Sequence, residues 1–161
     1  MKNFELSEFL GDWYLLEYEF AAETKLTHLD CLNFKFTLND VGIGSDMSVM
    51  VSNFTFRFPP KTGFTYHIPT FGLFSTNDNG QWTTNFKNVD MVSVVVDTDY
   101  SRWAVLAQCT KNSYGAPTFG SSRILSRSRT LSSADLDRAR AAIREAGIEG
   151  PYKYSIDQQD C

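Results

Sequence analysis

The sequence has no apolar run of about 20 residues, the length that a membrane-spanning helix needs. It also has no excess of basic residues, because 15 Lys and Arg stand against 19 Asp and Glu and leave a formal net charge of −4. Binding to a phosphate backbone needs a net basic face, so we expect no nucleic-acid partner. The first residues turn polar and acidic at once, unlike a cleavable leader. We therefore expect either a cytosolic protein or a mature secreted chain.

Signatures of enzymes and metal sites are equally scarce. The chain lacks HExxH and GxSxG, and Gly42 and Gly44 lack the third glycine of a dinucleotide-binding loop. His28 and His67 are the only histidines, and the sequence indicates no Ser or Cys partner for either. None of the three cysteines has the CxxC spacing of a zinc site. We expect no catalytic activity, no metal site and no required cofactor.

What the chain does contain is aromatic side chains and short strand-like segments. Its 161 residues correspond to a single domain, residues 1–161, and they include thirteen Phe, seven Tyr and three Trp. Apolar runs, some alternating with polar residues and bounded by turn signals, predict an all-β barrel or sandwich. The predicted strands cover residues 13–20, 31–37, 47–58, 64–74, 82–86, 91–96, 103–109 and 118–126.

One helix is specified near the C-terminal end of the chain. Ser132 and Asp135 resemble a capping box, and Gly147 stands where a left-handed residue commonly ends a helix. Between them, apolar residues recur at helical spacing and predict one buried stripe. A helical turn at residues 6–10 and a short strand at 152–156 are also predicted. We interpret the opposite, charged face of the helix as solvated: Asp137, Arg138, Arg140, Arg144 and Glu145.

Three short motifs follow one another along the chain: Gly11-Asp12-Trp13, Thr98-Asp99-Tyr100, and Arg127 just before the helix. Glycine permits a close backbone approach, and a neighbouring Trp commits a large apolar area to one spot. In this order and spacing the trio resembles the lipocalin family, over nearly the whole chain. The resemblance implies an eight-stranded antiparallel up-and-down β-barrel, or calyx, with one C-terminal α-helix packed outside. It also implies that the three motifs meet at the closed base, with Arg127 over Trp13.

The cysteines are similar to those of the arthropod, bilin- and carotenoid-binding branch, which includes insecticyanin, crustacyanin and apolipoprotein-D-like proteins. The resemblance implies a disulfide between Cys31 and Cys161. Cys109 lacks the upstream partner that relatives have, so it is either free or separated from its partner by truncation. The alternative is three reduced thiols in a cytosolic protein. We interpret the chain as secreted and extracellular.

Strand alternation and the resemblance together predict which side chains line the cup. We expect it to hold a small hydrophobic ligand, because the aromatic inventory exceeds what a barrel base needs. Asn53 begins a glycosylation sequon and is expected to face solvent. The predicted ligand-binding residues are Phe34, Phe36, Ser52, Phe54, Phe56, Tyr66, Phe71, Ser93, Leu106, Phe119 and Arg123.

Arg123 is unusual among these residues because a cation inside an apolar cup is costly unless it is paired. Its partner is expected to be either Glu17, which shares the inward parity of Trp13, or an anionic group on the ligand. The alternative is that Arg123 has a structural role, at the strand end or paired within the protein. His67 as a haem ligand and Cys109 as an isomerase nucleophile are weaker hypotheses, and parity places Cys109 outside the cup.

The sequence thus predicts an extracellular carrier, monomeric or homodimeric, with biliverdin or a carotenoid as the best guess for its ligand. The segment Ile124–Arg129 resembles the corresponding strand end of insect bilin-binding lipocalins. Alternatives are a salivary-type scavenger of haem, biogenic amines or fatty acids, and a lipocalin-fold isomerase.

Overall fold

The computed structural model describes residues 4–22, 29–39, 47–57, 65–75, 80–86, 89–111 and 117–161. These residues form nine strands and two helices, and every strand predicted from the alternation pattern is present. In chain order the elements are α1 (Leu6–Phe9), β1 (Gly11–Phe20), β2 (Asp30–Asn39), β3 (Met47–Arg57), β4 (Tyr66–Ser75), β5 (Gln81–Phe86), β6 (Val89–Thr98), β7 (Trp103–Lys111), β8 (Pro117–Ser126), α2 (Ser133–Glu145) and β9 (Tyr152–Ser155).

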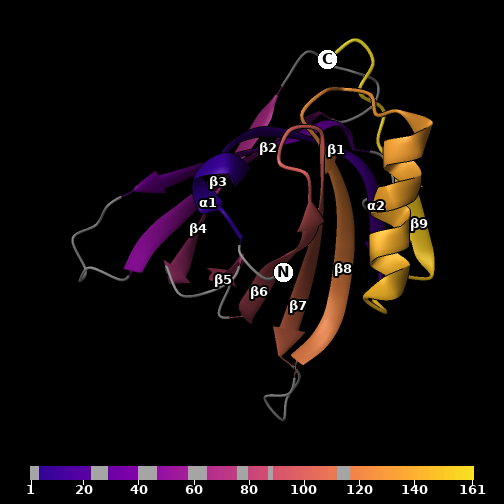
Figure 1. The fold of residues 1–161 in the computed structure, drawn as a ribbon. Helices are drawn as coiled ribbons and strands as arrows, with labels where there is room; N and C mark the ends of the chain where they lie inside the picture. The colour runs from indigo at the N-terminus through magenta and orange to yellow at the C-terminus, as the bar shows by residue number, and fades with distance from the viewer. Residues whose placement is uncertain are drawn as a thin grey trace.

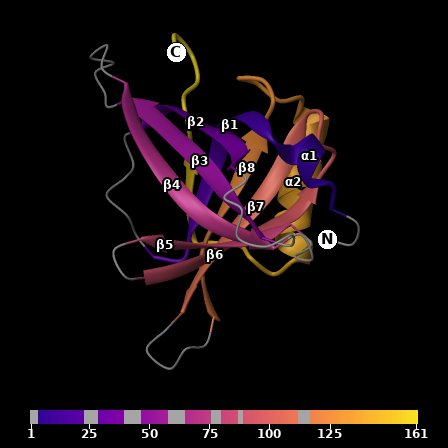
Figure 2. The same ribbon diagram turned by 90° about the vertical axis from the view of Figure 1, so that its left-hand side faces the viewer.

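The strands close into a barrel. From β2 to β8 each strand pairs antiparallel with the next, and β1 completes the circle by pairing with both β8 and β2. Figures 1 and 2 show α2 lying along the outside of this barrel, beside β7 and β8. The predicted eight-stranded antiparallel calyx with one external C-terminal helix is therefore confirmed. None of the described helices is both long and apolar enough to cross a membrane.

The closed base of the barrel is built around Trp13. Its ring is fully buried, stacks on Phe9 of α1 at 5.3 Å, and donates from Nε1 to the Phe9 carbonyl at 2.7 Å. The guanidinium carbon of Arg127 lies over the Trp13 ring, 3.7 Å from its centre. Gly11 has φ +101°, and a Cβ there would lie 3.3 Å from Arg127 Nη1, which explains the glycine. The predicted meeting of these motifs is confirmed.

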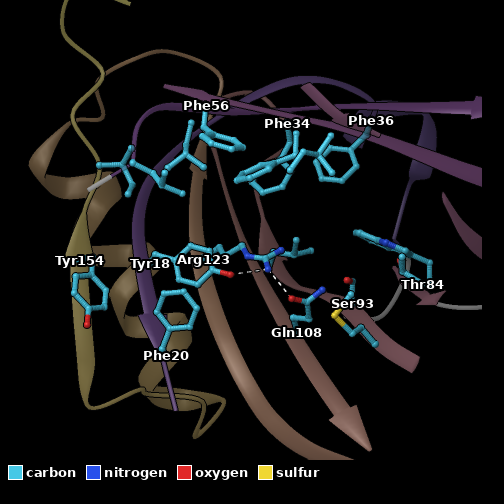
Figure 3. A pocket seen from close by; sticks show the side chains of 18 residues that line it. Tyr18, Phe20, Phe34, Phe36, Phe56, Thr84, Ser93, Gln108, Arg123 and Tyr154 are labelled. Atoms are coloured by element: carbon cyan, nitrogen blue, oxygen red, sulfur yellow. Dashed lines mark hydrogen bonds between the residues drawn. The ribbon is translucent and has the colours of Figure 1, made fainter. Parts of the chain in front are cut away.

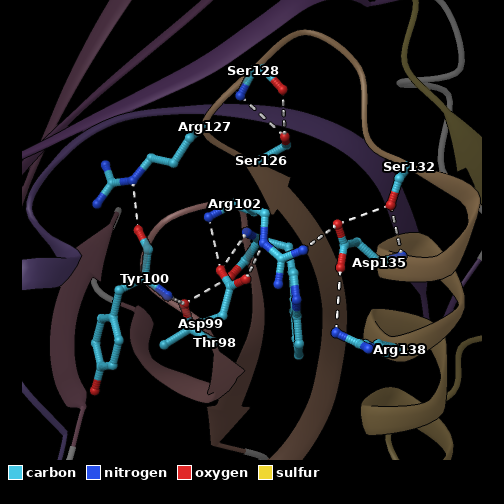
Figure 4. Close-up of polar contacts among 11 residues, drawn as sticks. Thr98, Asp99, Tyr100, Arg102, Ser126, Arg127, Ser128, Ser132, Asp135 and Arg138 are labelled. Atoms are coloured by element: carbon cyan, nitrogen blue, oxygen red, sulfur yellow. Dashed lines mark hydrogen bonds and ion pairs between the residues drawn. The ribbon is translucent and has the colours of Figure 1, made fainter.

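The turn between β6 and β7 completes the base (Figure 4). Thr98 Oγ1 donates to the Trp103 carbonyl at 2.7 Å and accepts the backbone N–H of Tyr100 at 2.8 Å. Asp99 accepts the backbone N–H groups of Arg102 and Trp103 at 2.8 and 3.0 Å. A local network of side-chain acceptors therefore holds the turn, as is usual for Thr and Asp at such positions.

Helix α2 begins as the sequence predicts. Ser132 Oγ accepts the Asp135 N–H at 3.1 Å, and the buried stripe of the helix packs on Trp103, Val105 and Ile124 of the barrel wall. The charged face is not uniformly solvated, which corrects the sequence-based interpretation. Arg140 forms an ion pair with Glu17 of β1, so this side chain of the charged face contacts the barrel.

The C-terminal segment fills a gap in the wall. β1 pairs with β2 only through residues 11–14, whereas its residues 17–20 pair with β9. Where the two strands separate, Gln158 donates from Nε2 to the carbonyls of Leu15 and Leu32 at 2.8 and 2.7 Å. The predicted disulfide is present between Cys31 and Cys161, and it ties the end of the segment to β2.

Candidate ligand-binding site

The barrel encloses a cavity of about 390 Å³, which is within the range of single-ligand pockets in proteins. Its walls come from β1 to β8 and from the C-terminal segment (Figure 3). Among the residues that the structure describes, eight aromatic ones line it: Tyr18, Phe20, Phe34, Phe36, Phe54, Phe56, Trp82 and Tyr154. Five aliphatic residues and one Met join them, namely Leu29, Leu32, Ile68, Leu106, Ile156 and Met91. The polar lining residues are Thr84, Ser93, Gln108 and Arg123.

A continuous aromatic wall covers one side of the cavity. Phe34 stacks on Phe36 at 5.8 Å with an interplanar angle of 12°, and it lies 5.0 Å from Phe54 on the neighbouring strand. Phe36 meets Trp82 edge-on at 5.7 Å, and Phe54 meets Phe56 at 5.4 Å. Residues two apart on a strand share a face, so alternation on β2 and β3 brings these rings together. The wall suits a flat, apolar ligand.

The structure brings seven of the predicted ligand-binding residues into this cavity wall. Tyr66 does not lie in the wall: it is 46% exposed, and its ring stacks on Phe56 at 5.3 Å. Phe119 does not lie there either. The described part of the structure does not include the side chains of three further predicted residues, Ser52, Asn53 and Phe71. It does not include His28 at all. The seven are Phe34, Phe36, Phe54, Phe56, Ser93, Leu106 and Arg123.

The prediction that Phe119 lines the cavity is wrong because the alternation of inward and outward side chains is interrupted on β8. Gln108 pairs with Ser121, but the next residue, Cys109, pairs with Phe119, so Gly120 is an extra residue on β8. A β-bulge of this kind reverses the facing of every residue beyond it. The expectation that Phe119 lines the cavity together with Arg123 is therefore wrong, because the bulge lies between the two residues.

A second bulge corrects the expectation for Glu17. The pairing of β1 with β8 shifts register between Leu15 and Glu17, so Glu17 leaves the inward face that Trp13 and Leu15 share. It pairs with Arg140 of α2, outside the barrel. Tyr18 and Phe20 take the inward positions instead, and sequence reasoning missed both as lining residues. Their alternation with Glu17 and Glu19 was a signal that could have identified them.

Tyr154 and Ile156 are the other notable omissions. The sequence predicts the short C-terminal strand that carries them, but nothing in a local pattern tells which edge of the sheet a strand joins. Pairing of β9 with the second half of β1 turns both side chains toward the cavity. The C-terminal segment is thus part of the site.

Arg123 is the one charged side chain among the described residues that line the cavity. Its Nη2 donates to Tyr18 Oη at 2.8 Å and to Gln108 Oε1 at 2.6 Å. Its guanidinium carbon lies 4.9 Å from the centre of the Tyr18 ring and 5.5 Å from that of Phe34. Its Nε is buried and has no hydrogen-bond partner in the described structure. The expected ion pair with Glu17 is absent, and neutral groups take its place.

A separate, polar cavity of about 330 Å³ lies outside the barrel between β1, β9 and α2. Its charges are mostly paired with one another: Glu17 with Arg140, and the buried carboxylate of Glu19 with Lys153 at 2.9 Å. The hydrogen bond that Arg140 donates to Glu17 raises the pKa of Arg140, and the one that Lys153 donates to Glu19 raises the pKa of Lys153. The pairing explains how acidic residues are accommodated beside the barrel wall without entering the main cavity.

The residues of the weaker hypotheses lie away from the cavity wall. His67 is exposed, and Ile68, the next residue on β4, lines the cavity, so His67 faces the other side of the strand. Cys109 is a free thiol, half-buried and not part of the lining. In this arrangement neither side chain reaches a ligand inside the barrel.

A family model described as the Lipocalin / cytosolic fatty-acid binding protein family matches residues 10–160. The chain belongs to this family. A comparison with curated protein sequences finds no match. Solved structures share the lipocalin fold with this chain.

Three similar structures illustrate the lipocalin likeness. Lobster apocrustacyanin A1 is 18% identical, with a TM-score of 0.65 over 96% of this chain and 79% of the other. The cockroach allergen Per a 4 is 16% identical, with a TM-score of 0.67 over 99% and 91%. The siderocalin Ex-FABP, which functions through dual ligand specificities, is 19% identical, with a TM-score of 0.66 over 96% and 97%. At these identities the likeness concerns the fold.

Proposed function

We propose that this protein is a secreted carrier that binds a small hydrophobic ligand in the barrel cavity and leaves it chemically unchanged. The observation that carries the proposal is the barrel cavity of about 390 Å³, whose wall holds eight aromatic residues among those that the structure describes. Burial of an apolar ligand against such a wall supplies affinity, and the few polar lining groups supply orientation. The disulfide supports a protein made for an oxidising compartment.

The best candidate ligand is biliverdin or another conjugated chromophore such as a carotenoid. The stacked rings of Phe34 and Phe36 offer a flat apolar face to a conjugated system, and Arg123 suits the propionates of a bilin. The similarity of the motifs to those of bilin- and carotenoid-binding lipocalins supports the same choice.

The geometry gives less support to the other candidates. A carrier of amines needs an acidic group in the cavity, but Glu17 pairs with Arg140 outside the barrel. Haem ligation by His67 and isomerisation by Cys109 both need side chains that face the ligand, and neither does. A fatty acid remains a fitting second candidate, because its chain matches the apolar wall and its carboxylate matches Arg123.

Visible absorption spectra of the purified protein, titrated with biliverdin, haem and a carotenoid, test the proposal. We expect a saturable, red-shifted long-wavelength band with biliverdin. Phe34→Leu removes part of the aromatic wall and should weaken binding about tenfold, whereas Tyr152→Leu, on the exposed side of β9, should leave it unchanged. No spectral change with any of the three ligands would rule out a pigment carrier and direct the search to colourless fatty acids.

A further inference from the structure

Arg123 occupies the interior of the cavity without a carboxylate partner. It projects from β8 between Tyr18 of β1 and Gln108 of β7, beneath the ring of Phe34 (Figure 3). A guanidinium does not escape burial by losing its proton. Its charge therefore has to be balanced by neighbouring groups, and a buried charge balanced only in part is costly.

The acidic residues closest in sequence to this site are turned away from it. Glu17 and Glu19 flank Tyr18 on β1, and both face the outside of the barrel, where they pair with Arg140 and Lys153. None of the described residues that line the cavity is acidic. The cavity therefore carries one positive charge and no negative one in the part of the chain that the structure describes.

The groups around the guanidinium have hydrogen-bond donors left over. Tyr18 Oη and Gln108 Oε1 both act as acceptors for Nη2, which leaves the Tyr18 hydroxyl hydrogen and the Gln108 amide hydrogens without acceptors among the described residues. Arg123 Nε is also buried and unpartnered. A tyrosine hydroxyl and a glutamine amide can each donate as well as accept. Three side chains with unused hydrogen-bond donors thus lie together at this point of the cavity wall. None of them carries a negative charge.

We propose that Arg123, Tyr18 and Gln108 form an anion-binding subsite that selects a ligand with a carboxylate on an apolar, conjugated or aliphatic body. A carboxylate offers about four acceptor positions, which match a planar guanidinium and two further donors. A cationic amine is disfavoured by the same arrangement, because it brings donors and positive charge to a region that already has both. The inference rests on the proposed function, since it requires that ligands enter this cavity.

The experiment compares retinoic acid, retinol and retinylamine, which share one conjugated body and end in a negative, a neutral and a positive group. Binding is measured by quenching of the protein's tryptophan fluorescence, to which Trp82 in the cavity wall contributes. We expect retinoic acid to bind about tenfold to hundredfold more tightly than retinol, as is typical of hydrogen bonds to charged groups, and retinylamine to bind more weakly than retinol. Arg123→Met should abolish the advantage of the acid over retinol.

Two further variants control the comparison. Arg138→Met makes the same change of net charge on the exposed face of α2 and should preserve the advantage of the acid. Gln108→Leu should reduce that advantage without abolishing it, and circular dichroism shows that each variant is folded. Equal binding of acid and alcohol to the unmodified protein would overturn the subsite while leaving the carrier function standing. Failure of all three retinoids and of the pigments to bind would overturn the proposed function, and the subsite with it.

Discussion

The guanidinium carbon of Arg127 lies 3.7 Å from the centre of the Trp13 ring, at the closed end of the barrel. The same guanidinium also connects segments that are far apart in the sequence, through hydrogen bonds. It donates to the backbone carbonyls of Glu8, Phe9, Asp12 and Tyr100. Burial lowers the pKa of Arg127, which the neighbouring charge of Asp12 opposes.

Arg127→Met should therefore destabilise the protein by about 3 kcal/mol, through loss of the cation–π contact and of several charge-assisted hydrogen bonds. Urea unfolding at neutral pH measures the change. Arg129→Met is the matched control, because Arg129 is exposed and lies 5.7 Å from the ring of Tyr14. It should cost less than about 1 kcal/mol. Equal losses in the two variants would show that Arg127 does not secure the base.

The base was predictable from sequence because the motifs that contain Gly11, Trp13 and Arg127 resemble those of the lipocalin family, and this resemblance implied that they meet. The cavity wall was predictable wherever alternation runs unbroken, as at Phe34, Phe36, Phe54 and Phe56 on β2 and β3. To predict these residues, it was enough to know which face of each strand points into the barrel.

The rest could not be predicted, since it depends on features that a period of two does not encode. One extra residue before Glu17 and another at Gly120 reverse the facing of their strands, which removed Glu17 and Phe119 from the wall. The contribution of Tyr154 depends on which free edge β9 joins, and that is decided by tertiary packing. The bulge in β1 brings Tyr18 inward, where it becomes one of the two neutral partners of Arg123.

Asp99 should make stability depend on pH in the acid range. Partial burial acts to raise the pKa of Asp99, but hydrogen bonds from the Trp103 and Arg102 backbone and from the Arg102 side chain outweigh it, so the pKa lies below its ordinary value. A carboxyl group with a lowered folded-state pKa stabilises the protein above its unfolded pKa of about 4 and loses that contribution as the pH falls through the folded value.

The expected result is a loss of stability below about pH 4 that is smaller in Asp99→Asn than in the unmodified protein. Urea unfolding at a series of pH values measures it. Asp137→Asn serves as the control, because the Asp137 side chain is 75% exposed on α2, and this variant should retain the acid dependence of the unmodified protein. An unchanged acid slope in Asp99→Asn would contradict the role assigned to the turn.

Gly150 should tolerate no side chain. A Cβ at this position would lie 2.5 Å from the Phe20 carbonyl oxygen and 2.8 Å from its carbon and nitrogen, all of them backbone atoms of β1. The backbone N–H of Gly150 also donates to the buried carboxylate of Glu19 at 2.9 Å. Gly150→Ala should therefore push β1 and the following segment apart and cost about 2 kcal/mol or more.

Gly147→Ala is the matched control for this substitution. Gly147 has φ +66°, but nothing lies within 4 Å of a Cβ placed there, so only the left-handed backbone conformation opposes alanine. Its cost should be about 1 kcal/mol. Thermal unfolding of both variants separates the two causes. A smaller loss at position 150 than at position 147 would mean that the contact with Phe20 relaxes freely.

The disulfide should control both stability and the integrity of the cavity wall. It joins residues 130 apart in sequence, and in the chain-entropy description a loop of that size contributes about 5 kcal/mol. Cys161→Ser should lower the unfolding free energy by that order, and reductant should do the same to the unmodified protein but have no further effect on the variant. Cys109→Ser, which alters the free thiol, should keep the full response to reductant.

Loss of the disulfide also releases the segment that carries Tyr154, Ile156 and Gln158. The first two line the cavity, and the third bridges β1 and β2 where they separate, so the wall should open beside β1. Bound retinol should then dissociate faster from Cys161→Ser than from the unmodified protein under conditions in which both are folded. Unchanged dissociation would show that the hydrogen bonds of β9 and Gln158 hold the wall without the covalent link.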